Sequence, residues 1–167
     1  VLALAESVES VKTNIIEVRP TIMTVVPKLL EMLKKKIVLS MEKEPGFKRK
    51  FFQWSVNTGI KYVHAKLEGR IPFGLQSKYN IADKFVFSKI REVLGGRMRL
   101  FASGGAAMPI DVGEFFLAVG ITTLEGYGLT EASPIVSLMR DDSLEMGTIG
   151  RPMFNLETKI AEDGELL

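Results

Sequence analysis

The chain contains no cysteine and a single histidine, His64. Without cysteine there can be no disulfide bond and no thiolate metal site, and one imidazole cannot build a zinc cluster. A Ser-His catalytic pair would have to use His64, which falls inside a helical pattern. We therefore expect His64 on a helix surface, outside any catalytic site.

Long apolar stretches and strong charge are also missing. No run approaches the roughly 18 consecutive apolar residues that span a bilayer, and the first segment, VLALAESVES, lacks the basic region and cleavage site of a signal peptide. The formal net charge of +2 is too small to indicate nucleic-acid binding, and no continuous basic tract alternates with aromatic residues. We expect a cytoplasmic globular protein that binds no nucleic acid.

Apolar residues, in contrast, make up 46% of the 167 residues, enough to bury one core. The first part of the pattern predicts a strand, PTIMTVV, and then a helix, PKLLEMLKKKI, with proline at its first position. Lys34, Lys35 and Lys36 fall near the predicted end of this helix, where lysine suits the negative end of the helix dipole.

A helical block follows from about residue 41 to residue 94. In its first half, EPGFKRKFFQWSVNTGIKYVHAKLEG, the helical spacing puts Phe47, Phe51, Trp54 and Ser55 on one face, and the only tryptophan is expected in the core. The second half, NIADKFVFSKIREVLGG, predicts an amphipathic helix that ends at the glycines. Its apolar side is predicted to carry Ile81, Phe85, Val86, Ile90, Val93 and Leu94.

Between residues 97 and 128 the pattern predicts two strands around one helix. RMRLFASGG is a buried strand that runs into glycines, MPIDVGEFFLAVG is a helix that starts with proline, and ITTLEGYG is a strand that runs into a glycine turn. Such a unit is parallel, and open parallel sheets bind ligands beyond the carboxyl ends of their strands. SGGAAMP and EGYGLTE would both lie there.

The last segment, LETKIAEDGELL, predicts a β-hairpin, because Asp163-Gly164 is a strong turn signal between two alternating runs. Its second strand stops almost at once, and the chain begins without methionine in mid-pattern. We expect an internal piece of a longer protein. The predicted fold class is α/β, with a layered parallel sheet, a helical insertion and a C-terminal β-hairpin.

The two glycine segments differ in what they indicate. SGGAAMP offers backbone N-H groups that no side chain covers, just before a helix N-terminus, and such groups suit an anion. A tight turn between strand and helix explains these glycines equally. The spacing of the glycines is not that of a dinucleotide-binding motif. EGYGLTEASP adds Tyr127, whose ring can stack on a base, Thr130, whose hydroxyl can bond a phosphate oxygen, and Glu131, whose carboxylate suits Mg²⁺. Together these three side chains indicate a nucleotide-phosphate site.

EGYGLTE also resembles the tyrosine-glycine-x-threonine-glutamate motif of the AMP-forming acyl-adenylate synthetases, a superfamily of acyl-CoA synthetases, peptide synthetase adenylation domains and firefly luciferase. SGGAAMP resembles the loop that precedes this motif, GTIGRP the glycine-x-x-glycine-arginine-proline segment that follows it, and LETKIAEDGELL the strand-turn-strand beyond. The helical block is most similar to the long-chain fatty acid-CoA ligase branch.

The resemblance implies a role for each residue of the two glycine segments. Those implied to bind the adenine nucleotide or to line the acyl pocket are Gly104, Gly105, Ala106, Glu125, Gly126 and Tyr127. Thr130 would contact the α-phosphate of ATP and Glu131 the Mg²⁺, which makes these two the candidate catalytic residues. The implied reaction converts a long-chain fatty acid and ATP to acyl-AMP and pyrophosphate, and then transfers the acyl group to coenzyme A.

Parts of the family pattern are missing from the sequence. The phosphate loop belongs upstream, and the ribose-binding aspartate, the hinge and the C-terminal domain with its catalytic lysine belong downstream. Residues 1–167 are therefore expected to form part of the large N-terminal adenylation domain, with a helical insertion at about 41–94, nucleotide-site loops at 102–109 and 124–134, and no C-terminal domain. The chain alone is expected to be inactive. Asn155 stands where the family usually has glycine, which puts the local turn in question.

Two alternatives stay open. One is another adenylate-forming enzyme, such as a medium-chain or aryl acid-CoA ligase or a peptide synthetase adenylation domain. The other is a non-catalytic α/β interaction module whose segment FKRKFFQW contacts a membrane surface, although the pattern favours a core helix with solvated lysines. Peripheral membrane association and a homo-oligomer are kept as open expectations.

Overall fold

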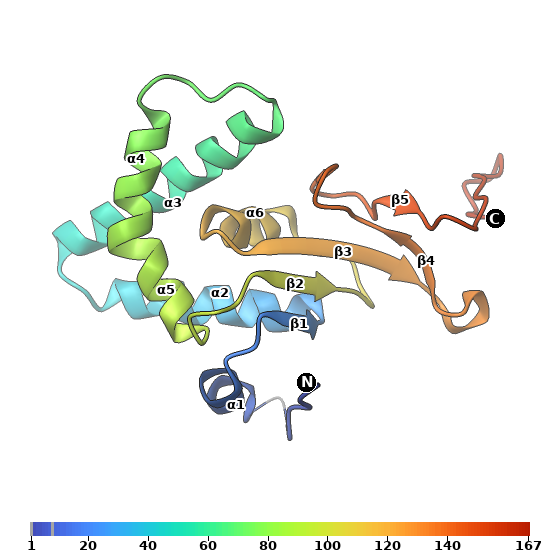
Figure 1. The fold of residues 1–167 in the computed structure, drawn as a ribbon, viewed down its shortest axis with the longest axis horizontal. Helices are drawn as coiled ribbons and strands as arrows, with labels where there is room; N and C mark the ends of the chain where they lie inside the picture. The colour runs from blue at the N-terminus through green and yellow to red at the C-terminus, as the bar shows by residue number, and fades with distance from the viewer. Residues whose placement is uncertain (1, 8) are drawn as a thin grey trace.

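A computed structural model of the chain describes residues 2–7 and 9–167. In this part of the chain five strands form one sheet in the order β1-β2-β3-β4-β5. The strands β1, β2 and β3 are parallel, and β4 and β5 continue the sheet in antiparallel pairing (Figure 1). Their bounds are Ile22–Val25, Leu100–Ser103, Thr122–Gly128, Ile135–Leu138 and Arg151–Pro152. The predicted α/β class is confirmed.

The helices form two groups. α2 and α6 contact each other behind the parallel strands, while α3, α4 and α5 form a helical block beside the sheet, in which α3 packs against α6 (Figure 1). A π-helical turn, η1, joins α4 to α5, and a short 3-10 turn, η2, follows β3. The bounds are α1 Val11–Val18, α2 Pro27–Glu42, α3 Gly46–Leu67, α4 Leu75–Ala82, η1 Asp83–Phe87, α5 Ser88–Val93, α6 Ile110–Ala118 and η2 Thr130–Ala132. The sequence pattern did not predict α1.

Aromatic side chains of the strands and of α6 form the centre of the core. Phe101 of β2 meets Phe116 of α6 edge to face at 5.2 Å between ring centroids, and Phe115 meets Phe116 in the same way at 5.2 Å. All three rings are fully buried, together with Leu30 of α2 and Ile121 before β3. Each buried aromatic ring contributes both apolar area and edge-to-face attraction, so this cluster fixes α6 against β2.

The predicted apolar face of the second helical pattern is wrong in three positions, because η1 changes the helical phase. Ile81, Phe85 and Val93 are 47%, 53% and 53% exposed, whereas the buried side chains are Ala82, Phe87, Ile90 and Leu94. A π-helical turn holds one residue more than an α-helical turn. Ala82 and Phe87, five residues apart, therefore lie on the same face, and the positions predicted from a continuous α-helix rotate outward.

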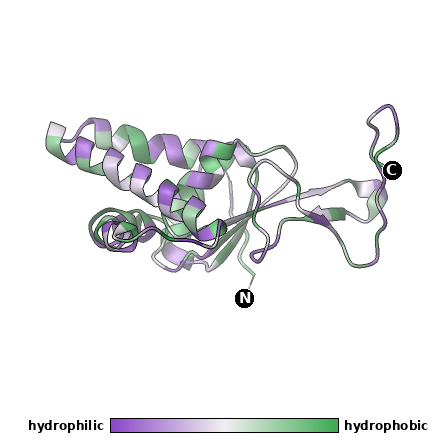
Figure 2. Cartoon of the chain, turned by 90° about the horizontal axis from the view of Figure 1, so that it is seen from above, coloured by the Kyte–Doolittle hydropathy of each residue, from purple (hydrophilic) through white to green (hydrophobic). Residues whose placement is uncertain are grey.

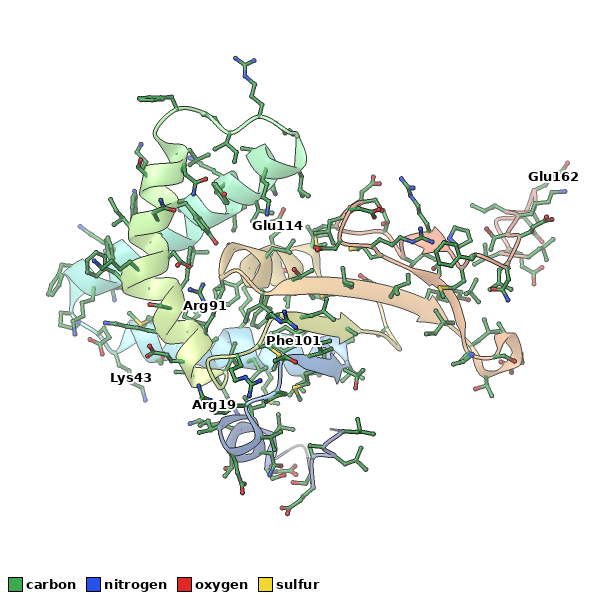
Figure 3. All side chains as sticks on the ribbon, in the orientation of Figure 1. Arg19, Lys43, Arg91, Phe101, Glu114 and Glu162 are labelled. Atoms are coloured by element: carbon green, nitrogen blue, oxygen red, sulfur yellow. The ribbon has the colours of Figure 1, made fainter. Side chains whose placement is uncertain are left out.

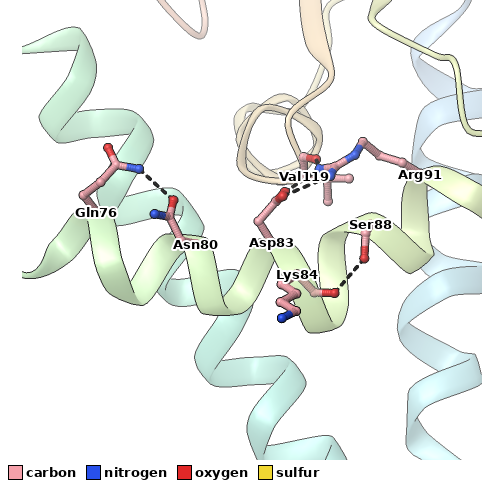
Figure 4. Close-up of polar contacts among 7 residues, drawn as sticks. All are labelled: Gln76, Asn80, Asp83, Lys84, Ser88, Arg91 and Val119. Atoms are coloured by element: carbon pink, nitrogen blue, oxygen red, sulfur yellow. Dashed lines mark hydrogen bonds and ion pairs between the residues drawn. The ribbon is translucent and has the colours of Figure 1, made fainter.

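Arg91 links this π-helical turn to the end of α6 by hydrogen bonds. The Nη1 group of Arg91 donates to Asp83 Oδ1 at 2.6 Å and to the backbone oxygen of Val119 at 2.6 Å, and its Nη2 donates to Asp83 Oδ2 at 3.1 Å (Figure 4). The two parallel N-H groups match the carboxylate geometry, which makes this a strong pair. The helical block is thus joined to the sheet layer by a polar contact in addition to its apolar packing.

α2 is longer than its sequence pattern predicts. It continues to Glu42, so Lys34 lies in its middle, and the interpretation of the lysines as a helix end is wrong. The ammonium group of Lys34 donates to the backbone oxygen of Asp111 at 2.9 Å and pairs with the Asp111 carboxylate. This lysine connects α2 to the first turn of α6.

Trp54 is not in the core, contrary to the prediction. Its side chain is 36% exposed and stacks on Phe51 at 5.3 Å, while Phe47 is 72% exposed. The buried side of α3 instead carries Phe52, Ser55, Thr58, Gly59, Val63 and Ala65. At Gly59 the missing side chain lets this helix approach Ala118 of α6 closely. Figure 2 shows polar and apolar residues interleaved along these long helices, which explains why the buried face was difficult to assign.

The C-terminal hairpin is confirmed. Lys159 N donates to Leu167 O at 2.9 Å and Ala161 N to Glu165 O at 2.8 Å, around the predicted Asp163-Gly164 turn. Asn155 is accommodated in a turn in which Leu156 N donates to Met153 O at 3.1 Å. Across residues 2–7 and 9–167, no helix combines the length and the apolar composition needed to cross a membrane.

The close contact between α3 and α6 predicts that adding one methyl group at Gly59 destabilises the fold. A Cβ atom at Gly59 would lie 2.8 Å from Ala118 Cβ and 2.8 Å from Phe87 Cζ, inside the packed core. Gly59→Ala should lower the free energy of unfolding by about 1 to 3 kcal/mol. Gly46→Ala is the matched control, since a Cβ atom there meets nothing within 4 Å. Denaturant unfolding would measure both, and equal stability of the two variants would contradict this packing.

Candidate functional site

The two glycine segments lie side by side at the carboxyl edge of the parallel strands. The last register pair of β2 and β3 is Ser103 with Glu125, and both segments continue from there. A Cβ atom at Gly104 would lie 3.4 Å from the backbone oxygen of Gly126. Residues 105–107 are exposed, so their backbone is accessible from solvent.

The second glycine segment differs from the predicted loop at 124–134, because its first half is strand. β3 continues to Gly128, and its last three residues pair antiparallel with β4, with an irregular register at Tyr127 and Gly128. A Cβ atom at Gly128 would lie 1.8 Å from the backbone oxygen of Pro134, so only glycine fits this close approach. The turn proper covers residues 129–134. This glycine is therefore explained by packing, whereas the polar and aromatic side chains beside it are not.

Tyr127, Thr130 and Glu131 are all accessible. The Tyr127 side chain is 39% exposed, and Thr130 and Glu131 are exposed in η2. The turn is held by backbone bonds from Ala132 N to Leu129 O at 3.0 Å and from Ser133 N to Thr130 O at 3.2 Å. Its side chains are consequently free to meet a ligand.

Glu131 fits a magnesium site of the kind that a nucleotide completes. In the part of the chain that the structure describes, no group of three or more His, Asp or Glu side chains lies close enough to hold a metal ion. Magnesium is commonly held by one or two carboxylates together with water and substrate phosphate oxygens. An exposed single carboxylate next in the chain to the exposed Thr130 is consistent with that arrangement.

Glu125 occupies a different environment from the other candidates. Its side chain is only 4% exposed, and Oε1 accepts a hydrogen bond from the backbone N-H of Met108 at 3.1 Å. Burial raises the pKa of this carboxyl group, and the bond from Met108 opposes that change. This contact links β3 to the end of the first glycine segment. The sequence could not indicate it, because it joins a side chain to a backbone group seventeen residues away.

The remaining sequence motifs have structural roles in the chain. The arginine-proline of GTIGRP forms β5, and Ser137 Oγ donates to Ile149 O at 2.9 Å beside it. His64 lies on the surface of α3, as predicted, with its Nε2 atom 2.6 Å from Glu114 Oε1. Figure 3 labels Glu114 on α6. Neither His64 nor Glu114 belongs to the two glycine segments.

Comparison with known proteins agrees with the motif reading. The family described as "AMP-binding enzyme" matches residues 3–167. The chain belongs to this AMP-binding enzyme family. It is 33% identical over 151 residues to the long-chain-fatty-acid-CoA ligase FadD15 of Mycobacterium bovis, covering 89% of this chain and 24% of that protein. It is 32% identical over 157 residues to the long-chain-fatty-acid-CoA ligase ACSBG2 of Xenopus laevis, covering 90% of this chain and 21% of that protein. The chain thus spans about a quarter of the length of these relatives.

Two solved structures of CoA ligases have the same fold as this chain. A benzoate CoA ligase from Burkholderia xenovorans LB400 matches with a TM-score of 0.54 and 23% identity, over 99% of this chain and 24% of that one. A long-chain-fatty-acid-CoA ligase, FadD1, from Archaeoglobus fulgidus matches with a TM-score of 0.52 and 19% identity, over 96% of this chain and 25% of that one. At these identities the likeness establishes the fold alone.

The buried hydroxyl of Ser103, beside the site, predicts that its removal does not destabilise this member of the AMP-binding enzyme family. Ser103 is 4% exposed, and among the described residues its Oγ atom is buried without a hydrogen-bond partner. An unpaired buried polar group costs roughly 1 to 3 kcal/mol, so Ser103→Ala should leave the free energy of unfolding unchanged or raise it.

Ser55→Ala is the matched control for Ser103→Ala. The Ser55 side chain is equally buried, but its Oγ donates to Phe51 O at 2.8 Å. Its loss should lower the free energy of unfolding by about 1 kcal/mol. Denaturant unfolding measures both variants, and a larger loss for Ser103→Ala than for Ser55→Ala would show that the Ser103 hydroxyl has a partner.

Proposed function

We propose that this chain is part of the adenylation domain of an ATP-dependent, AMP-forming acid-CoA ligase. The observation that carries the proposal is the exposure of Tyr127, Thr130 and Glu131 at the sheet edge where residues 104–106 lie beside β3. Packing accounts for the glycine at position 128, but it does not require a tyrosine, a hydroxyl and a carboxylate together. Membership of the AMP-binding enzyme family supports the same conclusion.

Each candidate residue has a distinct role in the proposed site. The backbone of Gly104, Gly105 and Ala106 would border the adenine and acyl groups, and the ring of Tyr127 would stack beside the base with Glu125 and Gly126 behind it. Thr130 would donate to the α-phosphate. Glu131 would hold Mg²⁺, which supplies positive charge to the phosphate oxygens as they become more negative.

The proposed reaction has two steps. A carboxylate oxygen of the acid forms a bond to the α-phosphorus of ATP as the bond to the bridging oxygen of pyrophosphate breaks. The thiol of coenzyme A then attacks the acyl carbon, and AMP leaves. In this scheme the residues of the chain bind, orient and stabilise charge, and none forms a covalent bond to the substrate.

We propose a long-chain fatty acid as the substrate of the parent enzyme. The relatives named as long-chain-fatty-acid-CoA ligases support this choice, as does the helical block of α3, α4 and α5. The alternative is an aryl acid, since a benzoate CoA ligase has the same fold. For either substrate, we propose that residues 1–167 belong to the large N-terminal adenylation domain, with its helical insertion at about 41–94, and that these residues alone are inactive.

The test of this function is ATP-pyrophosphate exchange by the full-length parent enzyme. Exchange should depend on palmitate and not on benzoate. Glu131→Gln should lower the exchange rate by roughly 10²-fold, because a metal ligand loses its charge, while the KM for palmitate changes little. Glu68→Gln, which makes the same charge change at an exposed site after α3, is the control. An unchanged rate and Mg²⁺ dependence in Glu131→Gln would remove this residue from the site.

We also propose that the parent enzyme associates peripherally with membranes through a groove in the helical block. A cavity of about 980 Å³ lies between α1, α2, α3, η1 and α5. Its lining includes Phe47, Phe51 and Phe85, which are exposed, and the lysines Lys12, Lys36, Lys48 and Lys89. Aromatic rings beside lysines are typical of surfaces that lie on anionic lipid headgroups.

The expected homo-oligomer stays a prediction, which light scattering on the parent enzyme can test.

Sedimentation with phosphatidylglycerol vesicles tests the membrane proposal. The parent enzyme should sediment with the vesicles, and the double variant Phe47→Ser, Phe51→Ser should lose most of this binding, because apolar burial contributes about 1.5 to 3 kcal/mol for each large side chain. Phe154→Ser is the matched control, since Phe154 is 90% exposed on the segment after β5. Equal sedimentation of the wild type and the double variant would contradict the proposal.

A further inference from the structure

We propose that Glu125 is a positioning residue that holds the first glycine segment in the shape that receives the nucleotide. The expected effect on catalysis rests on the proposed function. The hydrogen bond between Met108 N-H and Glu125 Oε1 is seen in the structure and does not depend on that function. Glu125 would act through the backbone N-H of Met108, and not by direct contact with adenine.

The first glycine segment is anchored at its two ends. Gly104 N donates to Val25 O of β1 at 3.2 Å, and Met108 N donates to Glu125 Oε1 of β3 at 3.1 Å. Between these anchors, the N-H groups of residues 105–107 make no hydrogen bond to other described residues. Their direction is therefore set by the anchors, and one of the two depends on the Glu125 side chain.

The surroundings of Glu125 indicate that its carboxylate is needed for the hydrogen bond to Met108 N-H and not for packing. Its carboxylate is buried, as is the Met108 side chain, which is 5% exposed. Burying a carboxylate is unfavourable unless it accepts hydrogen bonds, so an apolar residue would serve packing better. Ser103 is its register partner in β2, so the two side chains leave the sheet on the same face. Two polar side chains thus lie on one face of the sheet at the start of a segment in which the N-H groups of residues 105–107 have no hydrogen-bond partner among the described residues.

Two substitutions separate the hydrogen bond from the charge. Glu125→Gln keeps an oxygen that can accept from Met108 N-H. Glu125→Met keeps most of the side-chain volume but removes the acceptor, which leaves a buried N-H group unpaired. Glu114→Ala is the control, because Glu114 of α6 contacts His64 on the surface of α3 and does not touch the segment.

Hydrogen exchange on the full-length parent enzyme without nucleotide is the first measurement. In Glu125→Met, the Met108 amide, which alone among residues 105–108 has a hydrogen-bond partner in the described chain, should exchange about tenfold faster than in the wild type, while Glu125→Gln and Glu114→Ala stay within about twofold. Peptides from α6 should be unchanged in all variants. Unchanged exchange of the Met108 amide in Glu125→Met, or equal acceleration in Glu125→Gln, overturns the proposal.

The second measurement is the steady-state kinetics of the adenylation step. Glu125→Met should raise the KM for ATP by about tenfold with a smaller change in kcat, and Glu125→Gln should restore KM to within about twofold. Faster exchange of the Met108 amide with an unchanged KM for ATP overturns the role in nucleotide binding. If the wild-type parent enzyme shows no adenylation, the proposed function fails, and the exchange measurement still decides whether Glu125 holds the segment.

Discussion

The parallel register between β2 and β3 is the constraint on which the candidate site depends. Because Ser103 pairs with Glu125, the next residue of each segment, Gly104 after β2 and Gly126 within β3, lies against the other. The same register places the Glu125 carboxylate within hydrogen-bonding distance of Met108 N-H. A shift by one residue would turn the Glu125 side chain to the opposite face of the sheet and remove this link. The geometry of the site therefore follows from the pairing of two short strands.

Apolar packing holds that register in place. Phe101 and Phe116 fix α6 behind β2, and the start of α6 determines where the first glycine segment must end. On the other side of α6, the close approach of Gly59 and the bond from Arg91 to Val119 O attach the helical block. The exposed side chains Tyr127, Thr130 and Glu131 take no part in this core, so the scaffold leaves them available for a ligand.

The sequence pattern predicted which segments near the site form strands and helices. It did not predict the buried faces of the helices or the contacts between side chains and backbone. The strand-helix-strand unit followed from proline and glycine positions and from short apolar runs, which are local signals. The buried face of residues 81–94 could not be predicted, because a single π-turn shifts the helical phase and has no clear local signal. The prediction for Trp54 was wrong because the buried face of α3 contains Phe52, Ser55 and Gly59 and leaves Trp54 at its edge. The bond between Glu125 and Met108 depends on strand register, which the sequence pattern alone does not give.

The central claim is that one nucleotide occupies the edge formed by residues 104–106 and 127–131. A crystal structure of the full-length parent enzyme with a non-hydrolysable acyl sulfamate analogue of acyl-AMP tests it most directly. We expect the adenine ring beside Tyr127, the sulfamate group within hydrogen-bonding distance of Thr130, and the backbone of Gly105 against the ligand. An analogue bound elsewhere, with both segments free of contact, would contradict the account.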